Sequence, residues 1–280
     1  MHLFFTLFTG MNRLSKRVLK EKERDSMNNQ GKAVFAAVLA VMLSACAGST
    51  PGSLPEIHAI ASEVNLDEED GANFYQNTLD HPDSRYYRIN DYYNMKSSGG
   101  LHILPKFATY QQTSEYSCGC AAGLMVLNYY GNKDYDEAKI CELAGTTPTG
   151  GTSTEGLNEF FEGIGYKTEM HAETKKKYED IEACLEFLIS SIDQGIPVLV
   201  DWEDWIGHWQ VIIGIDTMET EAPYDDVLIM ADPYDITDHY QDGYYIVPYG
   251  RFFDMWREGP CTDQLIPYVQ AYLRVFPNGE

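Results

Sequence analysis

The stretch YQQTSEYSCGCAAGLMVLNYYG, residues 110–131, places a cysteine immediately before an apolar run. Residues 119–130 are apolar on nearly all sides, which is typical of a buried helix, and Gly131 is suited to end it. Cys118 therefore stands at the start of that helix. The positive end of a helix dipole and a neighbouring imidazolium both lower the pKa of a thiol, and the thiolate is the nucleophile. Cys118 is a candidate nucleophile, with core packing as the alternative interpretation.

The pattern after residue 131 changes from helices to strands. Helices are predicted over 134–145, 151–166 and 178–195, and the second has Thr152 and Glu155 spaced as a capping box. Segments rich in β-branched and aromatic residues predict strands over 197–202, 208–216, 227–233, 243–249 and 267–276. Helices followed by strands indicate an α+β fold, with a largely antiparallel sheet packed on one helical side.

A base that activates Cys118 must come from elsewhere in the chain, which has seven histidines. His208 stands at the start of a strong strand, directly after Gly207, which leaves its ring room to face a cleft. The other six lie near the N-terminus or in loop-like, turn-like or charged contexts: His2, His58, His81, His102, His171 and His239. His208 is the candidate base.

An acidic residue is needed to hold the imidazole in the correct tautomer. Asp232 ends the strand predicted next to that of His208, and Pro233 fixes the end of that strand. Asp216 and Asp235 are the fallback candidates. An acidic residue before a proline also commonly just ends a strand, so the assignment depends on the joint pattern.

A side-chain donor for the oxyanion is the fourth requirement. Gln112, six residues before Cys118, can fold back to supply it, and Gln111 is the competing choice. A glutamine before a helix is more often simply solvated. The combination of glutamine, cysteine at a helix start, Gly-His on a strand and Asp-Pro on the next is much less ordinary than any of its parts.

These segments resemble the bacterial double-glycine-type cysteine peptidases, peptidase family thirty-nine, in its stand-alone branch. The matching stretches are TYQQTSEYSCGCAAGLMVLNYYG, GHWQVIIGID and MADPYD. The resemblance covers about residues 101–276 and implies a papain-like fold. It assigns the nucleophile to Cys118, the base to His208, the orienting acid to Asp232 and the oxyanion donor to Gln112. Position 120 is often proline in this branch; here Cys120 either forms a redox pair with a neighbour or simply packs.

Further candidates surround the predicted site. Three tryptophans cluster around the histidine, and they either line a substrate cleft or shield the sheet: Trp202, Trp205 and Trp209. The glycine-rich loop PTGGTSTEG, with Thr152 at its centre, could border the cleft. It lacks the lysine of a phosphate-binding loop, so we expect no nucleotide there.

The N-terminal part has the build of an export signal. From Met27 a short polar start with Lys32 precedes an apolar run that ends in Leu-Ser-Ala-Cys. This end resembles the bacterial lipoprotein signal, which predicts lipidation of Cys46; cleavage near Ala47 is the alternative. We interpret residues 1–45 as an upstream segment plus signal peptide, 46–100 as a tether and surface-lying extension, and 101–280 as the peptidase domain.

Composition excludes some classes of function. Seven of the 20 basic and three of the 43 acidic residues lie in the first 45 positions. The chain after residue 45 therefore carries 13 basic and 40 acidic residues. Such an acidic surface repels nucleic acid and anionic headgroups. The six cysteines show neither a regular disulfide framework nor the spacing of a zinc site.

The sequence therefore predicts an exported cysteine peptidase, anchored to the membrane through lipid or secreted, that acts on a peptide or protein as a monomer without metal or cofactor. An acyltransferase that passes the acyl group to an amine is one alternative. A peptide-binding module that kept the cleft but lost turnover is the other.

Overall fold

The computed structural model describes residues 54–62, 66, 71–75, 78–257 and 267–277. The signal-like segment and Cys46 lie outside the described residues, and lipidation stays a prediction. Within the described ranges, no helix has the length and apolar character needed to cross a bilayer.

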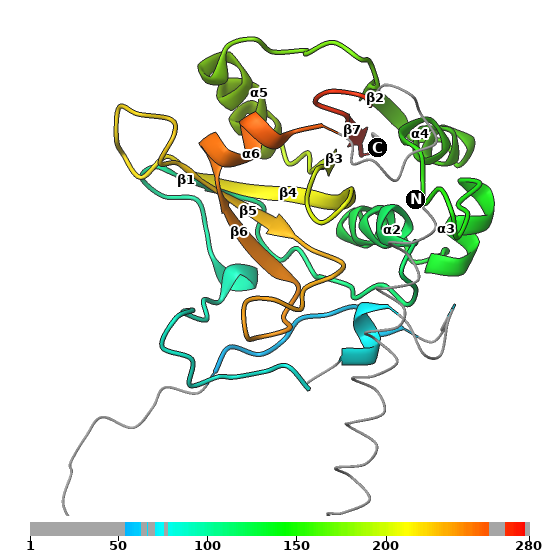
Figure 1. Cartoon of the computed structure of the whole chain (residues 1–280), viewed down its shortest axis with the longest axis horizontal. Helices are drawn as coiled ribbons and strands as arrows, with labels where there is room; N and C mark the ends of the chain where they lie inside the picture. Colours follow the sequence, from blue (N-terminus) through cyan, green and yellow to red (C-terminus); the bar gives the residue numbers. More distant parts are fainter. Residues whose placement is uncertain (1–53, 63–65, 67–70, 76–77, 258–266, 278–280) are drawn as a thin grey trace, which may run out of the picture. The chain divides into compact units, whose positions relative to one another are not determined.

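A seven-stranded antiparallel sheet forms one part of the fold (Figure 1). Its order is β2-β7-β3-β4-β5-β6, and β1 pairs with β4 beside this path. The strands are β1 Leu101–Ile103, β2 Lys167–His171, β3 Val198–Trp202, β4 His208–Asp216, β5 Val227–Ala231, β6 Tyr244–Pro248 and β7 Tyr272–Phe276. Strand β4 is central and almost entirely buried, so both of its faces are covered.

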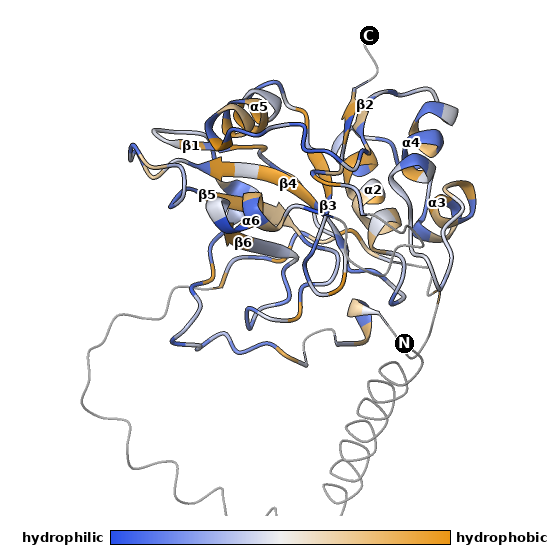
Figure 2. Cartoon of the chain, turned by 45° about the horizontal axis from the view of Figure 1, so that its top comes forward, coloured by the Kyte–Doolittle hydropathy of each residue, from blue (hydrophilic) through white to orange (hydrophobic). Residues whose placement is uncertain are grey.

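Helices cover the sheet. They are α2 Cys118–Tyr129, α3 Glu137–Leu143, α4 Thr154–Gly163, α5 Ile181–Asp193 and α6 Tyr249–Met255, with short 3-10 turns η1 Ala72–Tyr75 and η2 Tyr92–Asn94. Helices α2, α3 and α4 pack against one another, and both α2 and α5 pack against β4. Figure 2 shows the apolar strands β3 and β4 within this arrangement. The predicted α+β fold, with a buried cysteine-bearing helix on an antiparallel sheet, is confirmed.

Helix α2 matches its sequence signals closely. Its residues from Gly119 to Leu127 are buried, as the uniformly apolar pattern predicted. The chain leaves the helix through Gly131, whose φ of 79° favours glycine. Gly195, with φ of 75°, follows α5 in the same way.

Other elements differ from the prediction. Helix α4 is capped by the Ser153 side chain, which accepts from the Gly156 backbone N–H at 3.0 Å, so the capping box at Thr152 was wrong by one residue. The sequence did not predict β1, β2 or α6. The two strands are short and contain polar and charged residues, and α6 is an aromatic-rich segment after a strand; only tertiary contacts stabilise such elements.

The described part of the N-terminal extension contacts the loop that precedes α2. Ile60 N–H donates to the Thr109 carbonyl at 2.7 Å, and the His58 ring stacks on Tyr93 with centroids 3.8 Å apart. Gly71, at φ of 91°, lies so close to Thr113 that an added Cβ would be 2.5 Å from its carbonyl carbon. This extension therefore supports the segment leading to Cys118.

Candidate active site

Cys118 is the first residue of α2, where backbone N–H groups have no partner within the helix. Its side chain is half-buried. The next residue must be small, because a Cβ added at Gly119 would lie 2.7 Å from the Thr152 Cβ. The Cys-Gly sequence thus allows the loop before α4 to pack directly on the first turn of α2.

His208 is the first residue of β4 and follows Gly207, whose φ of 120° favours glycine. Its buried ring approaches Asp232, with Nε2 2.7 Å from Oδ1. This leaves Nδ1 for Cys118, whose thiol lies close enough to the ring to raise the pKa of His208. Burial lowers the pKa of His208, but the Asp232 carboxylate and Cys118 outweigh burial and hold this pKa well above its usual value.

Asp232 follows β5 and accepts three hydrogen bonds. One oxygen, Oδ1, contacts His208 and also accepts from the Tyr234 backbone N–H at 2.7 Å. The other, Oδ2, accepts from the Gln210 amide at 2.8 Å, and Gln210 in turn accepts from the Trp202 indole N–H at 2.8 Å. A buried series of hydrogen bonds, from Trp202 through Gln210, therefore fixes the Asp232 carboxylate on the side away from His208.

Gln210 is a site residue that sequence reasoning missed. The available signal was its spacing: residues two apart in a strand face the same side, so a buried glutamine two residues after the candidate base points toward the base's partner. No such spacing indicates Trp202, which reaches Gln210 from β3 through the pairing of Trp202 with His208.

Gln111 connects the loop before α2 to the turn after β5. Its amide nitrogen donates to the Asp232 backbone carbonyl at 2.9 Å. Its amide oxygen accepts from the Asp235 backbone N–H at 3.1 Å and from Gln241 at 3.2 Å. Both ends of this amide therefore help to hold the two segments together.

Gln112 is buried beside the same loop. Its backbone N–H donates to the Pro233 carbonyl at 2.9 Å, and its side-chain nitrogen donates to the Ser114 carbonyl at 2.6 Å. The amide oxygen has no partner among the described residues. Because an amide nitrogen carries two N–H donors, one remains for a further acceptor. Gln111 likewise keeps one N–H, but its amide is held at both ends and that of Gln112 at the nitrogen alone, so Gln112 as the oxyanion donor stays a prediction.

Glu137, on α3, holds the loop that carries these glutamines. It is fully buried and accepts from the Tyr110 hydroxyl at 2.9 Å and from the Thr113 hydroxyl at 2.7 Å and backbone N–H at 3.1 Å. Burial raises the pKa of Glu137, and hydrogen bonds from Ser117, Thr113 and Tyr110 partly oppose this shift. No local pattern indicates this contact, which joins residues 24 and 27 positions apart.

The two fallback acids lie away from the imidazole. Asp216 ends β4, at the opposite end of the strand from His208. Asp235 is buried and accepts from the Gly243 backbone N–H at 2.8 Å. Among the described residues, no group of three or more His, Cys, Asp or Glu side chains is arranged to hold a metal ion.

This arrangement corresponds to a known family. The model of the peptidase C39-like family matches residues 104–259, which include all four candidate site residues. The chain belongs to the peptidase C39-like family. No curated protein matches it in sequence.

Solved structures similar to this C39-like chain include two peptidase domains from transporters. The peptidase domain of Streptococcus ComA, a bi-functional ABC transporter involved in quorum sensing, is 19% identical, with a TM-score of 0.41 over 61% of this chain and 99% of that one. A double glycine motif protease from an AMS/PCAT transporter, in complex with its leader peptide, is 15% identical, with a TM-score of 0.41 over 64% and 95% of the two chains.

Three of the four residues suggested as substrate contacts are buried in this C39-like chain. Trp202 and Trp209 are each 2% exposed and Thr152 is 5% exposed. The Trp209 indole N–H donates to the Thr152 carbonyl at 2.9 Å, which joins β4 to the loop packed on α2. Trp202 and Trp209 are therefore part of the core, and their role as substrate contacts stays a prediction.

Trp205 differs from them. It is 54% exposed, on the loop between β3 and β4. With Asp204, Tyr87 and Tyr245 it lines a pocket of about 350 Å³ that reaches Asp232. This pocket borders the sheet side of the candidate site.

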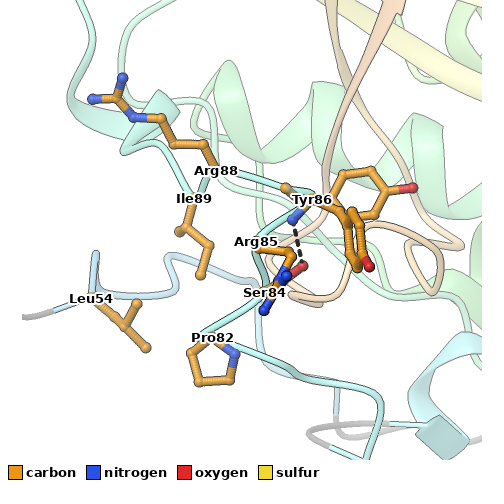
Figure 3. A pocket seen from close by; sticks show the side chains of 8 residues that line it. Leu54, Pro82, Ser84, Arg85, Tyr86, Arg88 and Ile89 are labelled. Carbon is orange, nitrogen blue, oxygen red and sulfur yellow. Dashed lines mark hydrogen bonds between the residues drawn. The ribbon is translucent and has the colours of Figure 1, made fainter.

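A second pocket, of about 430 Å³, lies on the N-terminal extension (Figure 3). Arg85, Tyr86 and Arg88 are among its lining residues, and the Tyr86 backbone N–H donates to the Ser84 hydroxyl at 3.2 Å. Tyr87 lines both pockets. None of the four candidate site residues lines this one.

Proposed function

We propose that this protein is an exported cysteine peptidase that hydrolyses a peptide or isopeptide bond through a thioester acyl-enzyme. The observation that carries the proposal is the series Cys118, His208 and Asp232, in which the imidazole bonds to the carboxylate and lies beside the thiol. Each member is supplied by a different element, and the series has the order of nucleophile, base and orienting acid that nucleophilic catalysis requires.

In the proposed reaction, the Cys118 thiol gives its proton to His208, and the thiolate attacks the substrate carbonyl. The remaining Gln112 N–H and the unpaired backbone N–H groups at the start of α2 stabilise the oxyanion. His208 then protonates the leaving amine, and the thioester remains on Cys118. Water attacks the thioester with the same imidazole as base, which releases the acid and regenerates the thiol.

The leaving part of the substrate must lie on the imidazole's side, because His208 protonates it. The pocket that Trp205 and Tyr87 line beside Asp232 is the surface available there. We therefore propose that a peptide or protein substrate occupies this pocket with the segment beyond the scissile bond.

Labelling with a peptidyl electrophile tests the proposed chemistry. The full chain should be labelled at one thiol at mildly acidic pH, and Cys118→Ala should remove the label. Cys184→Ala, which removes a buried thiol of α5, is the matched control and should leave labelling intact. Equal labelling of several thiols would contradict the proposal.

A specifically reactive Cys118 that forms a thioester and transfers its acyl group only to added amines would identify an acyltransferase. A chain that binds peptides but forms no thioester would identify a binding module.

Export and anchoring form a separate part of the proposal, supported by the Leu-Ser-Ala-Cys pattern that ends at Cys46. Mass spectrometry of the chain made in a bacterial host should find a lipid-modified Cys46 as the mature N-terminus. A mature chain that begins near Ala47 and carries no lipid would indicate secretion, and an uncleaved chain would contradict export.

A further inference from the structure

Two buried thiols near the site take no part in the proposed reaction. Cys120 is on α2 and Cys141 is on α3, and they are 0% and 7% exposed. Thr146 connects them: its hydroxyl contacts the Cys120 sulfur at 3.1 Å, and its backbone N–H donates to the Cys141 carbonyl at 2.9 Å. Helices α2 and α3 pack against each other, and Cys120 lies close enough to Cys141 to raise the pKa of that thiol, together with burial. The sulfur atoms are therefore neighbours across the contact between the two helices.

The other described cysteines are directed elsewhere. Cys118 and Cys120 are two positions apart on one helix, and such residues do not face each other. Cys118 accordingly contacts His208, whereas Cys120 contacts α3 and the loop before α4. Cys184, on α5, interacts with Tyr249. The geometry thus favours a pairing of Cys120 with Cys141 over a pairing of Cys120 with Cys118.

The same face of α3 supports the site. Glu137 and Cys141 are four positions apart, which places them one above the other on the helix. Glu137 holds the loop that carries Gln112, and Cys141 meets the helix that carries Cys118. A covalent link from Cys141 to α2 would therefore join α3, which holds the loop of Gln112, to the helix that begins at Cys118.

We propose that Cys120 and Cys141 form a disulfide when the chain folds in an oxidising environment. A low-molecular-weight or protein disulfide is the oxidant. One cysteine thiolate attacks it and displaces a thiolate, and the second cysteine then displaces the other half. The two cysteines lose two protons and two electrons, and the oxidant is reduced to two thiols. Cys118, facing His208, is left as a free thiol.

Peptide mapping of the full wild-type chain tests the pairing without any variant. The purified chain is incubated with oxidised glutathione, its remaining thiols are alkylated under denaturing conditions, and the digest is analysed by mass spectrometry. We expect a linked peptide containing Cys120 and Cys141, with Cys184 alkylated and Cys118 either alkylated or carrying glutathione but linked to no other cysteine. Alkylated Cys120 and Cys141, or a link from either to another cysteine, would overturn the proposal.

Thermal unfolding measures the consequence of the bond. A disulfide that closes the segment 120–141 should raise the midpoint of the oxidised chain above that of the reduced chain by about 5–10 °C. Cys120→Ala/Cys141→Ala should lose this dependence on reductant, and Cys184→Ala should keep it. Neither peptide mapping nor thermal unfolding depends on turnover. The disulfide can therefore be disproved without disproving the proposed peptidase activity, and the activity can be disproved without disproving the disulfide.

Discussion

The candidate site is built from two regions that are stabilised in different ways. On the helical side, Cys118 is positioned by packing: Gly119 lies against Thr152, and the buried Glu137 holds the preceding loop. On the sheet side, His208 is positioned by a line of hydrogen bonds that runs through Asp232 and Gln210 to a tryptophan indole.

This difference separates stability from reactivity. On the sheet side, the polar groups bond to Asp232, which in turn bonds to the His208 imidazole. Their loss should therefore alter the protonation and orientation of the base. Polar groups of the helical side touch a loop, so their loss should mainly destabilise the fold. The two regions meet where Gln111 and Gln112 bond to the backbone of Asp232 and Pro233.

The largest expected effect is on the sheet side. His208→Ala should slow alkylation of Cys118 by iodoacetamide at pH 6 by about 100-fold or more, because it removes the imidazole that takes up the thiol proton. Quantifying the alkylated peptide over time measures the rate. His102→Ala is the matched control, since His102 also pairs with a carboxylate, with Nδ1 2.7 Å from Asp193, but away from the thiol. An unchanged rate in His208→Ala would remove the basis of the proposed chemistry.

Glu137→Ala tests the helical side. Its removal leaves the Tyr110 and Thr113 donors buried without this acceptor, so the free energy of unfolding should fall by about 2–4 kcal/mol in urea titrations. The alkylation rate of Cys118 in the folded variant should change by less than about threefold, since Glu137 does not touch the imidazole.

Glu142→Ala is the control for this helix, because Glu142 is exposed and pairs only with Lys139 three residues away. It should change the unfolding free energy by no more than about 0.5 kcal/mol. If Glu137→Ala slowed alkylation as strongly as His208→Ala, the division between the two regions would be wrong.

Gln210→Leu should have an intermediate effect. It removes one hydrogen bond to the Asp232 carboxylate, which should slow alkylation of Cys118 by about 10-fold at pH 6. Trp202→Phe removes the indole N–H behind Gln210, together with part of the buried ring, and should slow alkylation by less than about threefold. The opposite order, with the tryptophan variant slower, would show that packing rather than the line of hydrogen bonds holds the carboxylate.

The smallest expected effect is a pH dependence of stability. Because the folded-state pKa of His208 is raised, its charged pair contributes fully below the unfolded pKa of about 6.5, and the contribution is lost as pH rises through the higher folded pKa. Charged groups near this ring include Asp232 and Asp204. Urea unfolding of the wild type and His208→Gln over this range should show a difference that shrinks with rising pH; a constant difference would contradict the prediction.

The half-buried Asp238 and the buried Asp242 are the reason for comparing wild type with His208→Gln. Burial is the main cause that raises their pKa values, to about 6 and about 7. An acid with a raised folded-state pKa also lowers stability as pH rises, so the wild-type profile alone would not isolate His208. Both acids are present in His208→Gln, and the difference between the two profiles removes most of their contribution.

The sequence by itself determined the features that depend on neighbouring residues. The uniform apolar run after Cys118 specifies a buried helix, and Gly207 before an apolar strand places His208 at its start, because helix and strand periods are local properties. The α+β class and the antiparallel sheet follow from the same local signals. Strand β2 and helix α6 escaped prediction because their local patterns are weak and their contacts are distant.

Only the tertiary structure decided how these elements meet. The sequence could not show that the segment after β5 holds both ends of the Gln111 amide, whereas the Gln112 amide is held at its nitrogen alone. It could not show that Trp202 and Trp209 are buried, nor that Glu137 holds the loop before Cys118. Each of these depends on contacts between residues distant in sequence, and residue spacing carries no record of which segments fold against each other.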